Sequence, residues 1–143
     1  MVGNKGKVVI DSSVALKWAL DEKEDLKEAL YIRELIKKRL IQGFVPSIFY
    51  YETLNTLFRK KPEKALRFLS LIRMSEILEC RLTVEQVLKA GELMQKYPQI
   101  SFYDACYHAL AMWEDAIFIT SDNKYYETTK KEGHITLLKN FTN

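Results

Sequence analysis

The chain has 143 residues, 48% of them hydrophobic and 29% charged, which suits one domain with a sizeable core and an ordinary charged surface. Its net charge of +3 is too small to argue by itself for a nucleic-acid partner. The longest uncharged stretch, Leu40–Tyr51, contains Gly43 and Pro46 and cannot span a bilayer, and the N-terminal apolar run is too short for a signal peptide. We therefore expect one soluble, cytoplasmic domain over residues 1–143.

Short apolar runs alternate with helical patterns along the chain, which is typical of βαβ units on a parallel sheet. We predict strands at Lys7–Ile10, Phe44–Val45, Glu76–Cys80, Ala116–Thr120 and Ile135–Leu138. We predict helices at Val14–Trp18, Glu24–Ile41, Ile48–Phe58, Pro62–Ile72, Val84–Tyr97, Phe102–Trp113 and Asn123–Lys131. Gly43 is interpreted as the cap of the second of these helices. The pattern predicts an α/β fold.

Two acidic residues follow predicted strands. Asp11 comes directly after the apolar run of the first strand, and Asp122 comes two residues after the fourth. Ligands of open parallel sheets bind outside the carboxyl ends of the strands, so both residues are candidates for a site. Each has an alternative role as a helix cap, Asp11 before Ser12 and Asp122 before Asn123.

Two further acids lie on predicted helices. Glu52 lies on the helix after the second strand, about one and a half turns past Pro46, and its alternative role is that of a solvated helix residue. Asp104 stands three residues after Ser101, in a pattern typical of a capping box, and introduces an unusually apolar helix. Glu79, near the end of the third strand, is the acid that most credibly competes with these candidates, whereas Glu114 and Asp115 precede the fourth strand and belong to the opposite end of the sheet.

Other catalytic devices are not evident. His108 lies in an apolar helix and is interpreted as a core histidine, and no Ser–His–Asp or Cys–His pattern is present. The chain has no glycine-rich phosphate loop, and Ser13 replaces the second aspartate that a phosphatase of the haloacid-dehalogenase type needs. Cys80 and Cys106 lack metal-ligand or redox spacing and are expected to be reduced and buried. Core packing is the favoured role for Tyr103 and Tyr125, with base stacking as the alternative.

A cluster of carboxylates without another catalyst suits phosphodiester cleavage. Two divalent ions roughly 3.5–4 Å apart can activate a water and stabilise the charge that develops on the phosphate and the leaving oxygen. Mg²⁺ prefers oxygen ligands, so acids suit it better than histidines or thiols. Without metal, the carboxylates should repel one another and raise some of their pKa values.

Four segments resemble, in order, the motifs of PIN-domain proteins of the VapC toxin type: Val9–Trp18, Pro46–Asn55, Ser101–Ala111 and Ile119–Asp122. The resemblance implies a three-layer α/β/α fold with a central, mainly parallel twisted sheet, usually as a homodimer. It implies that Mg²⁺ or Mn²⁺ is bound by four catalytic acids, namely Asp11, Glu52, Asp104 and Asp122. It also assigns supporting roles, through waters or outer hydrogen bonds, to Ser12, Asn55 and Thr120.

The activity that the resemblance implies is endonucleolytic cleavage of RNA. The expected partner is a small antitoxin protein whose C-terminal segment blocks the acidic groove, often through a basic side chain. Two alternatives stay open at the level of the sequence: a PIN-fold nuclease that processes RNA, and an inactive PIN-fold module that binds RNA or protein. An inactive module would have lost one or more of the acids, and all four are present.

Overall fold

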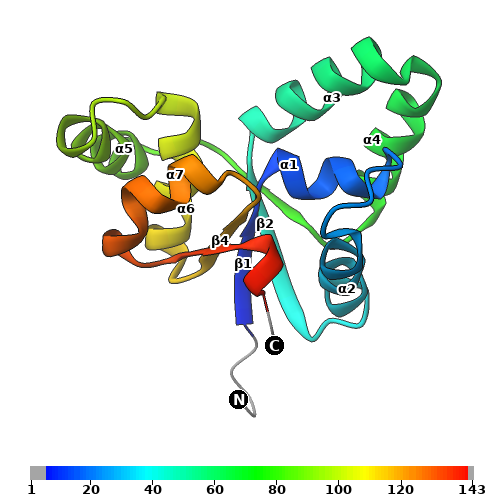
Figure 1. The fold of residues 1–143 in the computed structure, drawn as a ribbon, viewed down its shortest axis with the longest axis horizontal. Coiled ribbons are helices and arrows are strands. Elements are labelled where there is room, and N and C mark those ends of the chain that lie inside the picture. The colour runs from blue at the N-terminus through cyan, green and yellow to red at the C-terminus, as the bar shows by residue number, and fades with distance from the viewer. Residues whose placement is uncertain (1–5, 142–143) are drawn as a thin grey trace.

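A sheet of five parallel strands forms the middle layer of the protein (Figure 1). The structure is a computed structural model, and it describes residues 6–141. The strands are β1 (Gly6–Ile10), β2 (Ile41–Pro46), β3 (Leu78–Cys80), β4 (Ile117–Thr120) and β5 (Ile135–Leu137). Their order across the sheet is β3-β2-β1-β4-β5. The five predicted strands are therefore confirmed, and so is the parallel sheet.

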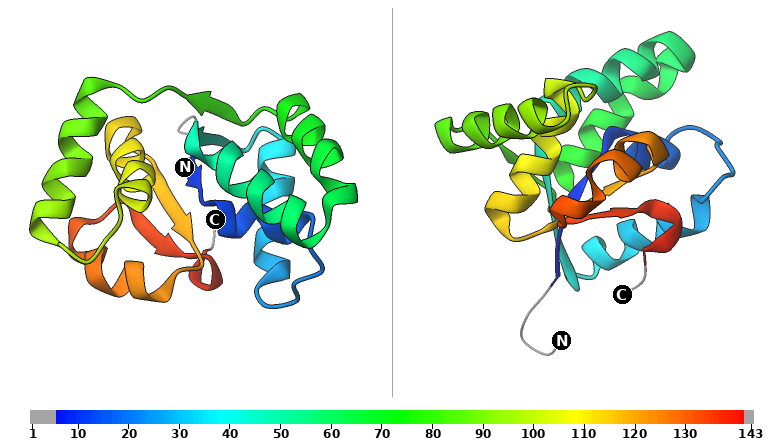
Figure 2. Two further views of the ribbon diagram at one scale, coloured as in Figure 1. Left: turned by 90° about the horizontal axis from the view of Figure 1, so that it is seen from above. Right: turned by 60° about the vertical axis from the view of Figure 1, so that its left-hand side comes forward.

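Helices cover both faces of this sheet. They are α1 (Ser12–Ala15), α2 (Leu26–Lys37), α3 (Ile48–Lys60), α4 (Ala65–Met74), α5 (Val84–Lys96), α6 (Phe102–Glu114) and α7 (Asn123–Thr129). Single 3-10 turns adjoin three of them, at Leu16–Trp18, Pro62–Lys64 and Lys130–Glu132, and a fourth turn, Leu138–Asn140, follows β5. Helices α1 to α4 lie on one side of the sheet and α5 to α7 on the other, as Figures 1 and 2 show. This arrangement confirms the expected three-layer α/β/α fold.

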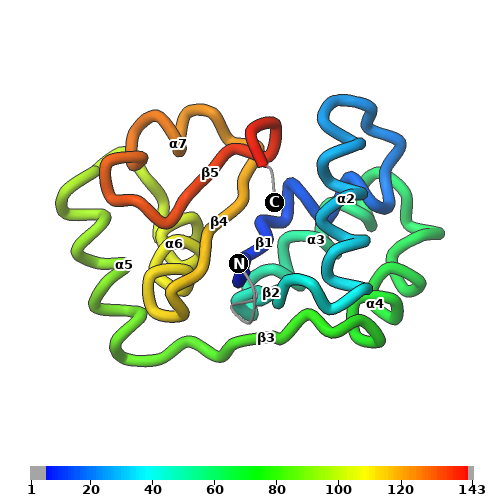
Figure 3. The backbone as a smooth tube through the Cα atoms, turned by 90° about the horizontal axis from the view of Figure 1, so that it is seen from below, coloured from blue at the N-terminus to red at the C-terminus, as the bar shows by residue number. Residues whose placement is uncertain are grey.

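The direction in which the sheet grows explains the two helical layers. From β1 the chain adds β2 and then β3 on one side, and afterwards returns to add β4 and β5 on the other side of β1. Crossovers between parallel strands are right-handed, so a reversal of direction moves the connecting helices to the opposite face. Figure 3 shows the chain passing through β3 on its way from α4 in one layer to α5 in the other.

The core is continuous through the three layers. Val9 and Ile10 of β1 and Ile119 of β4 are fully buried, as expected for strands covered on both faces. Helix α6 is buried without interruption from Ala105 to Ala111, which explains the apolar run in its sequence. Within residues 6–141, no helix is both long enough and apolar enough to cross a membrane.

The end of α2 differs from the prediction. The helix ends at Lys37, and Arg39 adopts a left-handed conformation with φ of 60°. The amides of Arg39 and Leu40 donate to the carbonyls of Ile36 and Leu35, which is the Schellman arrangement that usually employs glycine. Gly43 is not the cap: it lies inside β2, which is longer than predicted.

A close packing contact explains the glycine in β2. A Cβ atom at Gly43 would lie 3.1 Å from the side chain of Ile36, 3.2 Å from that of Ile10 and 3.3 Å from that of Ile77. These distances are shorter than ordinary carbon–carbon contacts, so the three isoleucine side chains already occupy the volume that a larger residue at this position would need.

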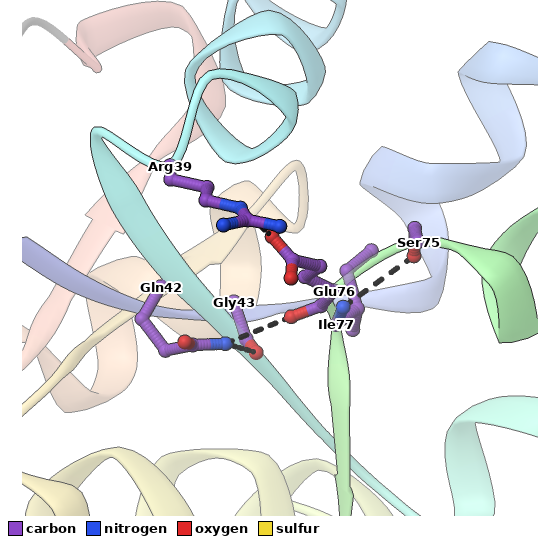
Figure 4. A network of polar contacts seen from close by, with 6 residues as sticks. All are labelled: Arg39, Gln42, Gly43, Ser75, Glu76 and Ile77. Carbon is purple, nitrogen blue, oxygen red and sulfur yellow. Dashed lines mark hydrogen bonds and ion pairs between the residues drawn. The ribbon is translucent and has the colours of Figure 1, made fainter.

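Polar contacts fix the segment before β3 onto the edge of β2, as Figure 4 shows. The Gln42 side chain donates to the Glu76 carbonyl at 2.8 Å, and the Glu76 carboxylate forms an ion pair with Arg39 at 2.6 Å. Both partners of the ion pair are largely exposed, so its contribution to stability is small. The contacts lie near the amino end of β2, on the side of the sheet away from the acidic residues.

Candidate active site

The centre of the sheet contains its topological switch point. Strands β1 and β4 are neighbours, but the chain leaves their carboxyl ends toward different helical layers, and in open sheets it is the crevice at such a point that binds ligands. Asp11 directly follows β1, and its backbone amide donates to the Ile119 carbonyl of β4 at 3.1 Å. Asp122 follows β4 and begins α7. Both strand-end acids therefore border the same crevice.

The carboxylate of Asp11 is held by two hydroxyl groups. Thr120 Oγ1 donates to Asp11 Oδ2 at 2.9 Å, and Ser13 Oγ donates to the same oxygen at 2.5 Å. Asp11 occupies the N-cap position of α1, yet its side chain accepts no capping hydrogen bond from that helix. The carboxylate therefore faces the inside of the site, contrary to the capping alternative.

Burial raises the pKa of the Asp11 carboxyl from its usual 3.8 to about 7. The side chain is only 8% exposed, and the negative charges of Asp104 and Glu52 raise this pKa further. The hydroxyl groups of Ser13 and Thr120 oppose these effects by stabilising the ionised form. Asp11 is therefore a buried acid whose charge the fold compensates only in part.

Asp104 lies close enough to the three other acids for their charges to interact. Burial raises its pKa first, followed by the charge of Asp122 and then that of Glu52, and Asp104 in turn raises the pKa of Asp11. Asp104 stands in the first turn of α6, where Ser101 Oγ accepts from its backbone amide at 3.1 Å. The predicted capping role of Ser101 is confirmed, and the Asp104 carboxylate belongs to the acidic cluster.

Asp122 combines two roles that the sequence left as alternatives. Its Oδ1 accepts from the Tyr125 amide at 2.9 Å and caps α7, so the capping role is confirmed. Its charge also reaches Asp104. The Asp122 side chain is exposed, whereas Asp11 is buried, so the cluster runs from the core outward to the mouth of the crevice.

Glu52 reaches the cluster from α3, in the other helical layer. The side chain is half-buried, and its Oε1 accepts a hydrogen bond of 2.7 Å from the Tyr107 hydroxyl. It is therefore not the freely solvated helix residue of the alternative interpretation. Tyr107 and Ser13 are functional residues that were not predicted from the sequence. A tyrosine inside the buried run of α6 was the available signal for Tyr107, because a buried phenol needs a hydrogen-bond partner.

The three residues proposed as support lie in different situations. Thr120 is buried and contacts Asp11 directly. Ser12 is half-buried and acts on the Tyr107 hydroxyl, lowering its pKa against the larger opposite effect of burial. Asn55 is exposed one turn beyond Glu52, and its Oδ1 accepts from Arg59 Nε at 3.3 Å, so its contact in this structure is with a base and not with the acids.

The acids are grouped more loosely than a complete metal coordination sphere. Among the side chains of residues 6–141, no three of His, Cys, Asp or Glu lie close enough together to hold one metal ion. A Mg²⁺ ion keeps several of its waters and is commonly held by only one or two carboxylates, so this spacing is compatible with the ion. The electrostatic repulsion within the cluster is the property that a cation would relieve.

Glu79 and His108, which the sequence analysis also considered, do not contact the acidic cluster in any hydrogen bond or ion pair described for residues 6–141. Glu79 is exposed on β3, and its charge acts on Tyr50 and Cys80. His108 is fully buried between the Tyr125 hydroxyl at 2.9 Å and the Gly133 carbonyl at 2.8 Å, which confirms it as a core histidine.

The two tyrosines and the two cysteines considered in the sequence analysis each include one buried and one more exposed residue. Tyr125 is buried as predicted, but Tyr103 is 57% exposed, so a core role for it is wrong. Both cysteines are free, with Cys106 buried and Cys80 half-buried.

The comparison with family models identifies the fold family. The model for the PIN domain matches residues 8–131, which include all four acids. The chain belongs to the PIN-domain family. No curated protein matches its sequence, whereas many solved structures share the PIN fold of this chain.

Three of those structures illustrate the likeness. A toxin–antitoxin complex from Klebsiella pneumoniae has a TM-score of 0.70 at 14% identity, over 92% of this chain and 97% of that one. VapBC2 from Rickettsia felis, bound to a DNA fragment from its promoter, has a TM-score of 0.68 at 18% identity, over 92% and 96%. VapC20 from Mycobacterium tuberculosis, a toxin that cleaves the sarcin–ricin loop, has a TM-score of 0.68 at 14% identity, over 84% and 93%. At these identities the likeness establishes the fold.

Proposed function

We propose that this PIN-domain protein is a metal-dependent endoribonuclease and the toxin of a toxin–antitoxin pair. The observation that carries the proposal is the position of Asp104, whose carboxylate interacts with those of Asp11, Glu52 and Asp122 at the switch point of the sheet. A buried acid whose pKa is raised by burial and by the charges of neighbouring carboxylates, as for Asp11, is a candidate for a functional site. Membership of the PIN family and the toxins among the structural neighbours support the assignment of RNA as substrate.

The donor set fits Mg²⁺ or Mn²⁺. The ligands would be the carboxylates of Asp11, Glu52, Asp104 and Asp122, all of them hard oxygen donors. When bound, such ions activate a water and stabilise the charge on the phosphate and the leaving oxygen. Thr120 and Ser13 both donate to Oδ2 of Asp11, so they fix the orientation of this carboxylate and leave Oδ1 for a ligand.

The position of the acids along the crevice suits a phosphodiester backbone that approaches from solvent. Asp122 is exposed at the mouth, Glu52 and Asp104 are half-buried, and Asp11 is at the bottom. Without cations this wall of carboxylates repels a phosphate, so substrate binding depends on the cations being present. A protein inhibitor can exploit the same charge, and we propose that the antitoxin inserts a basic side chain among these acids. We also propose that the active toxin is a cytoplasmic homodimer.

A cleavage assay with matched aspartate variants tests the nuclease. The purified protein is incubated with a structured RNA and Mn²⁺, beside Asp11→Asn as the blank and Asp115→Asn as the control. Asp115 lies before β4, at the opposite end of the sheet, and its left-handed conformation accepts asparagine. We expect cleavage by the wild type and Asp115→Asn, and none by Asp11→Asn or in the presence of EDTA. Equal cleavage by all three proteins would identify a contaminating nuclease and refute the proposal.

A further inference from the structure

The hydrogen bond between Tyr107 and Glu52 joins two helices that otherwise belong to different layers. Helix α3 packs against α1, α4 and β2, whereas α6 packs against α5, β1, β2 and β4. The two helices lie on opposite sides of the sheet in Figure 1. The Tyr107 hydroxyl nevertheless reaches Glu52 Oε1 at 2.7 Å. This side-chain contact therefore bridges the two helical layers.

Tyr107 is the rigid partner in this contact. It is fully buried, and its ring stacks on Phe118 of β4 with a centroid separation of 5.4 Å and an angle of 14° between the planes. The ring therefore has little freedom to follow a moving partner. Its hydroxyl group can donate one hydrogen bond, and the Glu52 carboxylate accepts it.

Glu52 is the flexible partner. Its side chain has three rotatable bonds and is half-buried on a helix whose outer surface faces water. Holding such a side chain in one rotamer costs conformational entropy, and the charges of Asp11 and Asp104 repel the Glu52 carboxylate. Without a donor on the far side of the crevice, Glu52 is expected to turn outward into solvent.

We propose that Tyr107 is a positioning residue whose hydroxyl group holds the Glu52 carboxylate beside Asp11 and Asp104, ready to bind a divalent cation. The inference rests on the proposed function, because it concerns the same acidic site. The hydrogen bond uses one lone pair of Oε1 and leaves Oε2 for the cation. Removal of such an outer hydrogen bond commonly lowers metal affinity about 10- to 100-fold.

The substitution Tyr107→Phe tests the hydroxyl group alone, because it keeps the ring and its stacking on Phe118. The matched control is Tyr97→Phe, which removes a tyrosine-to-carboxylate hydrogen bond to Glu132, 2.5 Å long and outside the acidic cluster. Mn²⁺ binding to each folded protein is measured by isothermal titration calorimetry and by the loss of the electron paramagnetic resonance signal of free Mn²⁺. We expect a 10- to 100-fold loss of Mn²⁺ affinity in Tyr107→Phe and no change in Tyr97→Phe.

A double-mutant cycle separates positioning from a structural role. Once Glu52→Ala has removed the carboxylate, adding Tyr107→Phe should change Mn²⁺ affinity no further. An additional loss in that background would show that the hydroxyl group acts on the whole fold, and would overturn the proposal. Wild-type affinity in folded Tyr107→Phe would overturn it as well.

Further measurements distinguish failure of the positioning role from failure of the proposed function. If Tyr107→Phe does not fold, the contact is measured in the metal-free wild type instead, as a nuclear Overhauser effect between the Tyr107 ring and the Glu52 side chain, and the absence of this effect would overturn the proposal. If the wild type binds Mn²⁺ with the expected dependence on Tyr107 but cleaves no RNA, the proposed function fails and the positioning role stands. If the wild type cleaves RNA but Tyr107→Phe keeps the Mn²⁺ affinity of the wild type, the proposed function stands and the positioning role fails.

Discussion

Replacing Asp11 with asparagine should stabilise the metal-free protein at alkaline pH. In the unfolded chain this carboxyl loses its proton near pH 3.8, but in the folded protein near pH 7. Between these values the folded state binds more protons than the unfolded state, so the free energy of unfolding falls as the pH rises and stays low above about pH 7. The difference of about 3 pH units corresponds to about 4 kcal/mol lost by the wild type at pH 8.

Asparagine is neutral at every pH and escapes this loss. Its amide oxygen can still accept from Thr120, but its NH₂ group becomes partly buried, which costs about 1–3 kcal/mol. The net gain at pH 8 is therefore about 1–3 kcal/mol, or roughly 3–10 °C in Tm for a chain of this size. At pH 5 the advantage of the variant should shrink by about 2–3 kcal/mol, because the folded wild type is then protonated.

Thermal and urea unfolding in EDTA, at several pH values between 5 and 8, measures this difference. Asp21→Asn, a substitution of an exposed acid outside the cluster, provides the control for a general charge effect. A stability difference between Asp11→Asn and the wild type that stays constant from pH 5 to pH 8 would refute the reasoning, because it would mean that Asp11 titrates alike in the folded and unfolded chains.

Three other predictions concern the site and the core. Mn²⁺ at 100 times Kd should add about 2.7 kcal/mol to the free energy of unfolding of the wild type and so raise its Tm, and it should leave the Tm of Asp11→Asn unchanged; equal Tm shifts in both proteins would argue against the metal site. Thr120→Val, which removes a donor to Asp11 at 2.9 Å, should raise the Asp11 pKa further, by about one unit, in a carbon-detected NMR titration, and an unchanged midpoint would contradict the role of that hydroxyl. Gly43→Ala should lower the free energy of unfolding in urea by about 1–3 kcal/mol, because the new methyl group meets three isoleucine side chains. Gly91→Ala, in a helix and with no atom within 4 Å of the added Cβ, should raise it by about 0.5–1 kcal/mol, and the reverse order of these two variants would show the packing argument to be wrong.

Strand ends were the most informative feature of the sequence. The apolar runs before Asp11 and Asp122 place both residues at the carboxyl edge of a parallel sheet, and this edge is where the structure has them. Glu52 and Asp104 could be selected only through their resemblance to family motifs, because a helix position does not reveal which layer the side chain faces. Their electrostatic contact with Asp11 depends on α3 and α6 being packed on opposite faces.

Residues that act through hydroxyl groups were harder to predict. Ser13 entered the sequence analysis only as a missing aspartate, and Tyr107 only as part of an apolar run, although both donate to acids of the site. The hydrogen-bond partners of these hydroxyl groups depend on tertiary packing, which leaves no local pattern in the sequence. The same limit applies to Gly43, whose function in β2 depends on isoleucines from three other segments, while Arg39 performs the capping that is usual for glycine.

The order of the strands has a consequence for the synthesis of the protein. Strand β1 emerges first from the ribosome, but one of its two neighbours is β4, and Thr120 follows Asp11 by 109 positions. The pocket around Asp11 therefore cannot close until most of the chain has been translated, and such long-range pairing is intrinsically slow to form. A nascent chain carries all the residues of the first two motifs before the site exists, and the acidic site can assemble only once the segments with Asp104 and Asp122 have left the ribosome.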